Sequence, residues 1–368
     1  MPDCHSGGQE FDSPMHCKNS KHMSVGVISM GISCPIIKEG DNLKKIILDS
    51  IFQCTTLQEG DIIGITESVV ARAEGNYVTV DDIAKETIRL FGKNSEIKLV
   101  YPIYSRNRFS LILKGIARGC KKVMLSASNF DEVGNVFGIN PWTGVDIKEY
   151  YKNIVEAENC KFELNKSFFG NKVLICSLHN PDYWKSLFKH SVIHTLTDYF
   201  PDKCKCGLLG SNKATEEKLK LFPSENYSNS LVNDIRNHIK EKLGINIEVM
   251  VYGDGCFKDP DSGIWEFADP VCSPAYTSGL EGSPNEIKLK AFADDKYKDL
   301  KGKELEKAIK EEIKNKNKNL KGTMASQGTT PRRYVNLLAS LMDLTSGSGD
   351  KGTPVVIVRN YFKNYSNV

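Results

Sequence analysis

Short apolar runs alternate with stretches of helical spacing along most of the chain. VGVISMG (25–31) and DIIGIT (61–66) have the length and apolar character of buried strands. Between them, the leucine and isoleucine positions of residues 42–52 share one face of a predicted helix. The polar residues after DIIGIT favour a helix start, so the N-terminal part predicts a βα beginning.

The middle of the chain repeats this alternation. KLVYPIY (98–104), KKVMLSAS (121–128) and KVLICSL (172–178) read as strands, and helical spacing recurs near residues 109–116 and Tyr150. We find no phosphate loop, no paired catalytic motif and no repeat here. Residues 101–199 are therefore predicted to be an α/β insertion or a substrate-shaping region.

The C-terminal part begins with a predicted helix that runs to Gly244, with Ser228 or Ser230 as its N-cap. A strand follows at 246–252. The charge-rich residues 294–322 predict a solvated amphipathic helix. A last helix near 334–344 and a buried strand from Thr353 complete the pattern.

These patterns predict a mixed α/β fold. Its core is expected to consist of residues 24–100 together with 200–368, interrupted by the α/β insertion. Residues 1–23 are polar and aperiodic, and we expect a disordered leader there.

Composition limits the classes of partner. The 368 residues carry a formal charge of only +3, which favours neither nucleic acid nor an anionic membrane as a partner. No apolar run approaches the length of a membrane span, so we expect a cytoplasmic protein. The 11 cysteines are scattered and odd in number, which favours free thiols. Cys204 and Cys206 lack a second pair at zinc-finger spacing and are read as structural.

The densest chemical signal is an acidic segment after the predicted strand 246–252. Glycines and a proline let this segment bring carboxylates together, and Mg²⁺ or Mn²⁺ prefers such oxygen ligands beside phosphates. An exposed acidic turn is the alternative, although three aromatic residues in the segment favour packing. The spacing does not fit a calcium loop. The candidate metal ligands are Asp254, Asp259, Asp261, Glu266 and Asp269.

A glycine-rich segment, SGSGDKGT (346–353), is the second signal. Its three glycines allow backbone N–H groups to approach a phosphate, and Lys351 adds a positive charge. The order of Lys351 and Gly352 excludes a Walker A loop, and a flexible linker is the alternative. A third signal, Arg332 and Arg333 at a predicted helix start, suits an anionic substrate, with a surface role as the alternative.

In order and spacing, four blocks resemble the coenzyme F420 gamma-glutamyl ligase family. They are TESVVARAEG (66–75), GLLGSNKATEEKLKLFP (207–223), the acidic segment and LTSGSGDKGTPVVIVRN (344–360). The resemblance implies a GTP- (or ATP-) dependent ligase that joins L-glutamate to a carboxylate of an acidic acceptor through an acyl phosphate. It also implies two divalent cations, K⁺ as a monovalent cation, and a homodimer.

The resemblance assigns site residues position by position. The family's metal-binding aspartate falls on Asp254, whereas two further metal ligands fall on Leu209 and Gly255 and a glutamine falls near Ser348. We expect the other carboxylates of the acidic segment to replace them. The catalytic candidates are Asp254, Arg72 and Lys351. The nucleotide-binding candidates are 34–37, Glu67, Ser68, Arg72, Asn212, Ser346, Gly347, Ser348, Gly349, Asp350, Lys351, Gly352 and Thr353.

Arg72 stands where the family has a lysine, and a guanidinium binds phosphate in bidentate geometry. The leading hypothesis is thus a gamma-glutamyl ligase whose acidic segment and glycine-rich segment meet around a polyphosphate. Two alternatives stay open: a metal-dependent phosphohydrolase, and a non-catalytic nucleotide-binding regulator.

Overall fold

The computed structural model describes most of the chain from Val25 onward, so the predicted leader lies outside it. Of residues 254–258 and 265–272 it describes the backbone alone. The described residues are 25–102, 104, 109–126, 128–129, 131, 136–139, 144–164, 170–176, 185–186, 192–258, 265–316, 323, 326, 328, 332–347, 349–364 and 366.

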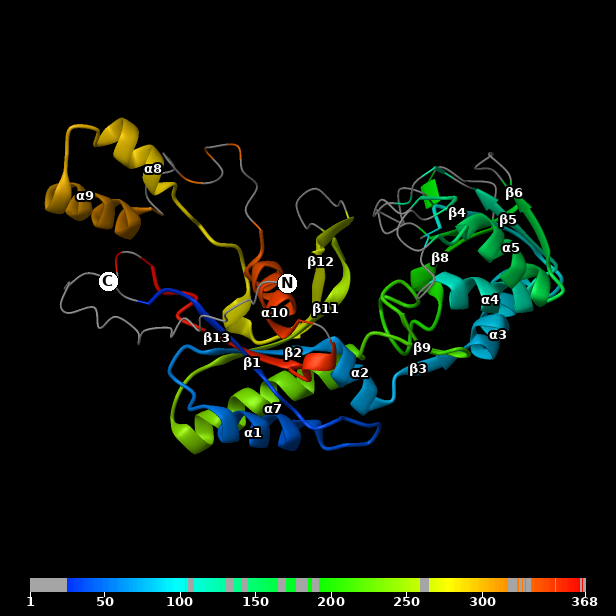
Figure 1. Cartoon of the computed structure of the whole chain (residues 1–368), viewed down its shortest axis with the longest axis horizontal. Coiled ribbons are helices and arrows are strands. Elements are labelled where there is room, and N and C mark those ends of the chain that lie inside the picture. Colours follow the sequence, from blue (N-terminus) through cyan, green and yellow to red (C-terminus); the bar gives the residue numbers. More distant parts are fainter. Residues whose placement is uncertain are drawn as a thin grey trace, which may run out of the picture.

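A five-stranded mixed sheet forms the centre of the fold, in the order β1-β13-β2-β11-β12 (Figure 1). The pair β2 and β11 is parallel, and the other neighbours are antiparallel. Its strands are β1 (Ile28–Ile32), β13 (Val355–Arg359), β2 (Ile62–Thr66), β11 (Glu248–Lys258) and β12 (Trp265–Tyr276).

Helices cover both faces of this sheet. Helices α1 (Leu43–Cys54) and α7 (Glu225–Leu243) pack on one face, and α10 (Tyr334–Ser346) packs on the other (Figure 1). Because side chains alternate along a strand, Val251 joins the core under α7 while Tyr252 joins the core under α10. The apolar sequences of β2, β11 and β13 are therefore accounted for by two cores.

Helix α10 approaches the sheet closely at a glycine. A Cβ atom at Gly64 in β2 would lie 2.1 Å from Sδ of Met342 in α10. No side chain fits in that space, so glycine at position 64 lets the C-terminal turns of α10 settle on the strand. The glycine-rich segment that follows α10 is thereby held over the end of β2.

The middle of the chain forms a separate parallel sheet in the order β6-β5-β4-β7-β8. Helices α3 (Val80–Phe91), α4 (Phe109–Gly119) and α5 (Ile147–Ala157) contribute to its core. The sheet begins with β4, before residue 101, so it extends beyond the predicted insertion 101–199. Its strands are β4 (Glu96–Val100), β5 (Lys122–Ser126), β6 (Lys161–Leu164), β7 (Lys172–Ile175) and β8 (Val192–Thr195).

A small antiparallel sheet lies between these two parts, in the order β3-β10-β9 (Figure 1). It consists of β3 (Tyr77–Thr79), β10 (Lys218–Lys220) and β9 (Asn212–Thr215). β3 continues directly into α3, whose start is fixed by a capping box between Thr79 and Asp82. The small sheet thus links the mixed sheet to the parallel sheet.

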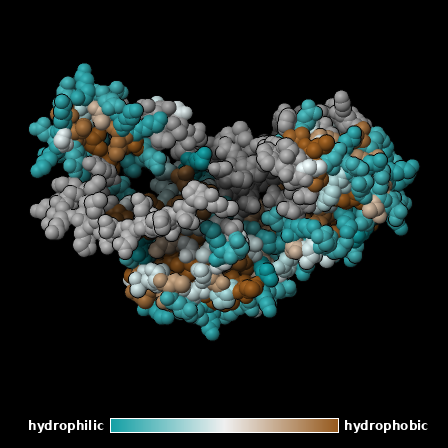
Figure 2. Space-filling model, in the orientation of Figure 1, coloured by the Kyte–Doolittle hydropathy of each residue, from teal (hydrophilic) through white to brown (hydrophobic). Residues whose placement is uncertain are grey.

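Short elements complete the described chain: α2 (Glu67–Glu74), η1 (Leu196–Asp198), η2 (Ser278–Leu280), α8 (Leu289–Ala291), η3 (Phe292–Lys296), α9 (Gly302–Asn315) and η5 (Gly349–Lys351). Helix α9 and η3 form a small core of their own around Phe292 and Ile309. Figure 2 shows hydrophobic residues between α8 and α9, surrounded by hydrophilic ones.

The mixed α/β class predicted from the sequence is confirmed. Three local predictions are wrong. α7 begins after Ser224, whose hydroxyl accepts the N–H of Tyr227, rather than after Ser228 or Ser230. The amphipathic helix predicted over 294–322 is confined in the described residues to α9. The acidic segment continues β11 to Lys258 and pairs it with β12, so much of it is a hairpin and not a loop.

The seven cysteines whose side chains the structure describes are free thiols, as predicted: Cys34, Cys54, Cys120, Cys160, Cys176, Cys204 and Cys206. Within the described residues, no helix has the length and hydropathy of a membrane span.

Candidate active site

The start of α2 lies where three strands of the mixed sheet meet. β2 runs straight into α2 at Thr66, and the N–H of Thr66 donates to the carbonyl of Pro354 at 2.9 Å. On the other side, Tyr252 of β11 is paired with Thr66. Since β13 and β11 flank β2, the backbones of Pro354 and Gly253 lie about 10 Å apart. The structure therefore brings the glycine-rich segment and the start of the acidic hairpin to the same edge.

A cavity of about 460 Å³ lies at this edge, and we name it the glycine-loop pocket. The N-terminal turn of α2 provides Ser68, and Arg72 follows one turn later on the same face. A helix N-terminus with an adjacent guanidinium is suited to an anion. The pocket is lined by Cys34, Pro35, Ile36, Ile37, Thr66, Ser68, Val69, Arg72, Asp343, Ser346, Gly347, Gly349, Gly352, Thr353 and Pro354.

The glycine-rich segment is fastened at both ends. The hydroxyl of Thr353 donates to the carbonyl of Ser346 at 2.8 Å, and the N–H of Cys34 donates to the carbonyl of Gly352 at 3.0 Å. Gly347 and Gly352 have φ angles of 67° and 64°, in the left-handed region that glycine adopts without strain. The segment is accordingly a closed loop that exposes backbone to the pocket.

Beneath this loop lies a fully buried tyrosine. The Tyr252 ring packs in the core under α10, and its buried hydroxyl has no partner in hydrogen-bond geometry among the described residues. Burial raises the pKa of Tyr252 to about 12, against the opposing effect of the Ser346 side chain. The hydroxyl therefore keeps its proton at neutral pH under the floor of the pocket.

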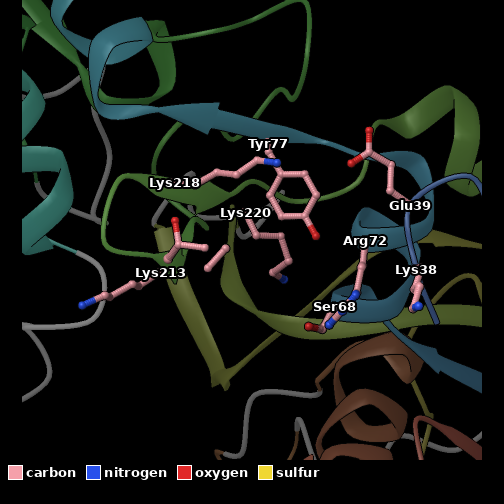
Figure 3. Close-up of a pocket in the computed structure, with 10 residues that line it drawn as sticks. Lys38, Glu39, Ser68, Arg72, Tyr77, Lys213, Lys218 and Lys220 are labelled. Carbon is pink, nitrogen blue, oxygen red and sulfur yellow. The ribbon is translucent and has the colours of Figure 1, made fainter. Parts of the chain in front are cut away.

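A second cavity of about 480 Å³, the basic pocket, lies beside α2 (Figure 3). Ser68 and Arg72 line both cavities, so α2 forms their common wall. The small sheet supplies most of the remaining side chains. The basic pocket is lined by Lys38, Glu39, Ser68, Arg72, Tyr77, Lys213, Ala214, Thr215, Lys218 and Lys220.

A buried ion pair connects the basic pocket to β11. Nζ of Lys220 lies 2.6 Å from Oε1 of Glu67, and the two side chains are only 10% and 6% exposed. A Cβ atom at Gly253 would lie 1.9 Å from Cγ of Glu67, so the Glu67 side chain occupies the space that glycine leaves. The pair therefore fixes the first residue of α2 between β10 and the backbone of β11.

Comparison with known proteins assigns the chain to a family. The family model described as F420-0:Gamma-glutamyl ligase matches residues 31–360. The chain belongs to the F420-0:gamma-glutamyl ligase family. No individually curated protein matches the sequence. Membership supports an enzyme that ligates glutamate, and the family name implies glutamate and an F420-related acceptor as substrates.

Of the metal ligands that the ligase resemblance implied, the structure describes the side chain at position 209. Leu209 is 3% exposed and packs in the core that it shares with the parallel sheet, and its apolar side chain offers no metal-binding atom. Among the described side chains, no group of three or more His, Cys, Asp and Glu residues could hold a metal ion. Asp254, Glu266 and Asp269 lie on the hairpin strands, of which the backbone alone is described, and Asp259 and Asp261 lie outside the described residues. The implied ligand set therefore does not fit at Leu209.

Several predicted contacts of the ligase lie away from the glycine-loop pocket. Glu67 is paired with Lys220, and neither Asn212 on β9 nor the exposed Asp350 and Lys351 of η5 lines either cavity. Ser348 lies outside the described residues.

The two substrate arginines also lie elsewhere. Arg333 is the N-cap of α10, about 20 Å along the helix from Ser346. Its Nη2 donates to the Tyr276 hydroxyl at 2.6 Å, and it lines a separate, smaller cavity with Cys204 and Cys206. Arg332 is exposed beside it. Neither arginine lines the glycine-loop pocket or the basic pocket.

Sequence reasoning missed the lysines of the small sheet. Lys218 and Lys220 flank the buried Leu219, so alternation places both on the opposite face of β10. The alternation of Lys218, Leu219 and Lys220 was the sequence signal that could have revealed these lysines. The pairing of Lys220 with Tyr77 of β3, which completes the basic pocket, depends on a contact between distant parts of the chain.

Proposed function

We propose that the chain is a nucleotide-dependent ligase that forms an amide between the amine of L-glutamate and a carboxylate of an acidic small molecule. The observation that supports it is the common wall formed by Ser68 and Arg72 between the glycine-loop pocket and the basic pocket. A nucleotide held in the first cavity has its terminal phosphate at the border of the second. The acceptor carboxylate then approaches from the basic pocket.

The proposed reaction has two steps. A carboxylate oxygen of the acceptor attacks the γ-phosphorus, the bond to the β,γ-bridging oxygen breaks, and nucleoside diphosphate leaves. The glutamate amine then attacks the acyl carbon, the bond to the phosphate oxygen breaks, and the amine proton is released with phosphate. Either GTP or ATP supplies the same chemistry.

The protein's own groups act by position and charge. Backbone N–H groups of the glycine-rich loop and the first turn of α2 are suited to hold the phosphates. Arg72 is suited to stabilise the charge that develops on the transferred phosphoryl group. Burial of the Glu67–Lys220 pair keeps the start of α2 in place during both steps.

We also propose dependence on Mg²⁺ or Mn²⁺, held by the acidic hairpin that begins at Asp254, with K⁺ as a monovalent activator. When bound, the divalent cation supplies charge neutralisation on the phosphates. We further propose a homodimer. Replacement of Asp254 by asparagine should abolish nucleotide turnover while the protein stays folded.

The test is incubation of the protein with nucleotide, Mg²⁺, isotope-labelled glutamate and a metabolite extract, followed by mass spectrometry. A labelled product heavier than its precursor by one glutamyl unit, formed only with nucleotide, is expected. The Arg72→Ala variant should lose this product, and Arg89→Ala, an exposed arginine on α3, should keep it. Nucleotide hydrolysis that proceeds at the same rate without extract or glutamate would instead identify a phosphohydrolase. Nucleotide binding without turnover would identify a regulator.

A further inference from the structure

The basic pocket has a charge that its own residues do not neutralise. Five of its ten lining side chains are cationic and one, Glu39, is a carboxylate. Lys220 is paired with Glu67, and Lys213 lies 2.6 Å from Glu216. Even when these two carboxylates outside the lining are included, five cations face three carboxylates. The pocket therefore carries an excess of two positive charges.

The three remaining cations are distributed around the cavity. Lys38 and Arg72 form no ion pair with any residue that the structure describes. Lys218 places its Nζ 4.1 Å from the ring centre of Tyr77, which offers an aromatic face and not a countercharge. Figure 3 shows Lys218 and Tyr77 on one side, and Arg72 and Lys38 on the other. An anion bound between them would face positively charged side chains on both sides.

Glu39 does not cancel this field at the centre of the pocket. A Cβ atom at Gly75 would lie 2.7 Å from Oε1 of Glu39, so the carboxylate lies at the C-terminal end of α2. Glu216 is 86% exposed, and its ion pair with Lys213 is therefore a weak one. Both carboxylates are exposed and Glu216 is outside the lining, whereas Lys218 and Lys220 extend from β10, which is paired on both sides.

We propose that the basic pocket is the acceptor subsite and that the acceptor is a polyanion, with at least two negative groups besides the carboxylate that reacts. This inference rests on the proposed ligase function, which requires an acceptor next to the nucleotide. A cavity of about 480 Å³ suits a small organic molecule. Phosphate esters and additional carboxylates both meet the requirement, because lysine binds either group as a point charge. Arg72, which lines both cavities, would then contact the reacting carboxylate and the transferred phosphoryl group.

Calorimetric titration with two simple probes tests the charge requirement. Glutarate carries two carboxylates, and butane-1,2,3,4-tetracarboxylate carries four on a similar chain. At constant ionic strength the tetracarboxylate should bind at least about tenfold tighter. Equal affinity for the two probes would overturn the proposal.

Lysine variants test whether the tetracarboxylate binds in the basic pocket. Lys38→Gln and Lys218→Gln together should weaken tetracarboxylate binding by about tenfold, and Lys38→Gln alone by about threefold. Because Lys38 is exposed, the single variant should fold like the unmodified protein. The control Lys45→Gln changes an exposed lysine on α1 outside both cavities and should bind like the unmodified protein. An unchanged affinity in the double variant would overturn the proposal.

A non-hydrolysable GTP analogue separates the two cavities and the two hypotheses. Tetracarboxylate binding should persist when the analogue is saturating, because the anion and the nucleotide occupy different pockets. Displacement of the tetracarboxylate by the analogue would place the anion in the glycine-loop pocket and would refute the acceptor subsite. Failure of the analogue to bind at all would refute the proposed ligase function, while the glutarate and lysine comparisons would still decide the anion preference.

Discussion

Replacement of Lys220 by methionine tests whether the start of α2 is held by a buried charge pair. Methionine preserves most of the length and apolar stem of lysine but removes the ammonium. Glu67, with a side chain that is 6% exposed, then loses the cation 2.6 Å away. Breaking a buried pair by removing one partner costs about 3–5 kcal/mol, because the remaining charge stays out of water.

The loss of unfolding free energy depends on burial, so an exposed ion pair serves as the reference. Lys205 forms an ion pair with Glu225, and their side chains are 76% and 42% exposed. Lys205→Met should cost less than about 1 kcal/mol. The double variant Glu67→Gln with Lys220→Met removes both charges and should recover at least half of the loss caused by Lys220→Met.

Urea unfolding gives the free energies, and hydrogen exchange of residues 67–74 reports whether α2 loosens locally. Lys220→Met should accelerate exchange in α2 and β10 more than in the parallel sheet. A loss below about 1 kcal/mol, equal to that of Lys205→Met, would refute the reasoning that burial sets the energy of this pair.

Three further outcomes follow from the site. Arg72→Ala should weaken binding of a GTP analogue by about tenfold or more, whereas Arg72→Lys should stay within about threefold, as calorimetry can measure. Leu209→Asp, which introduces the aspartate that the ligase resemblance implies there, should cost about 3–5 kcal/mol in urea unfolding because it buries a charge in the core. Leu344→Asp, at 81% exposed, should be nearly neutral. Gly352→Ala should cost about 1 kcal/mol through its left-handed backbone alone, since a Cβ meets nothing within 4 Å, and Gly26→Ala should cost less.

The elements predicted best are those whose apolar pattern is continuous. The first four residues of β2 (IIGI) and of β13 (VVIV) are apolar and buried, because both strands lie inside the sheet with helices on both faces. The start of α7 was misplaced because its first two turns, from Glu225 to Ser230, are almost entirely polar. Only the geometry of Ser224 shows where the helix begins.

Helix α3 was not predicted, although its N-terminus carries the capping signal of Thr79 and Asp82. One of its buried positions is the polar Thr87, whose hydroxyl lies 3.1 Å from that of Tyr199. A buried polar contact of this kind interrupts the apolar period, and the partner is 112 residues away. The other buried positions, Val80, Ile83, Ala84 and Phe91, still keep helical spacing, so this pattern and the cap together were sufficient to predict α3.

At the site, the limit is that some of its residues come from distant segments of the chain. The glycine-rich loop was recognisable because its phosphate-binding potential resides in eight consecutive residues. The basic pocket takes Lys38, Arg72 and Lys218 from segments far apart in the chain, and β-pairing of Lys218 with Thr79 brings them together. No local motif contains that information.

The division of the site between two kinds of element has a consequence for specificity. The glycine-rich loop is tied to β2 and to residues 34–37 by backbone hydrogen bonds, so its shape depends on the central sheet. Three lysines of the basic pocket, Lys213, Lys218 and Lys220, lie on β9 and β10, whose side chains can change while the strand pairing stays the same. Substitutions at Lys213 and Lys218 should accordingly alter which anion is accepted without altering nucleotide binding, because the two cavities share only the α2 wall.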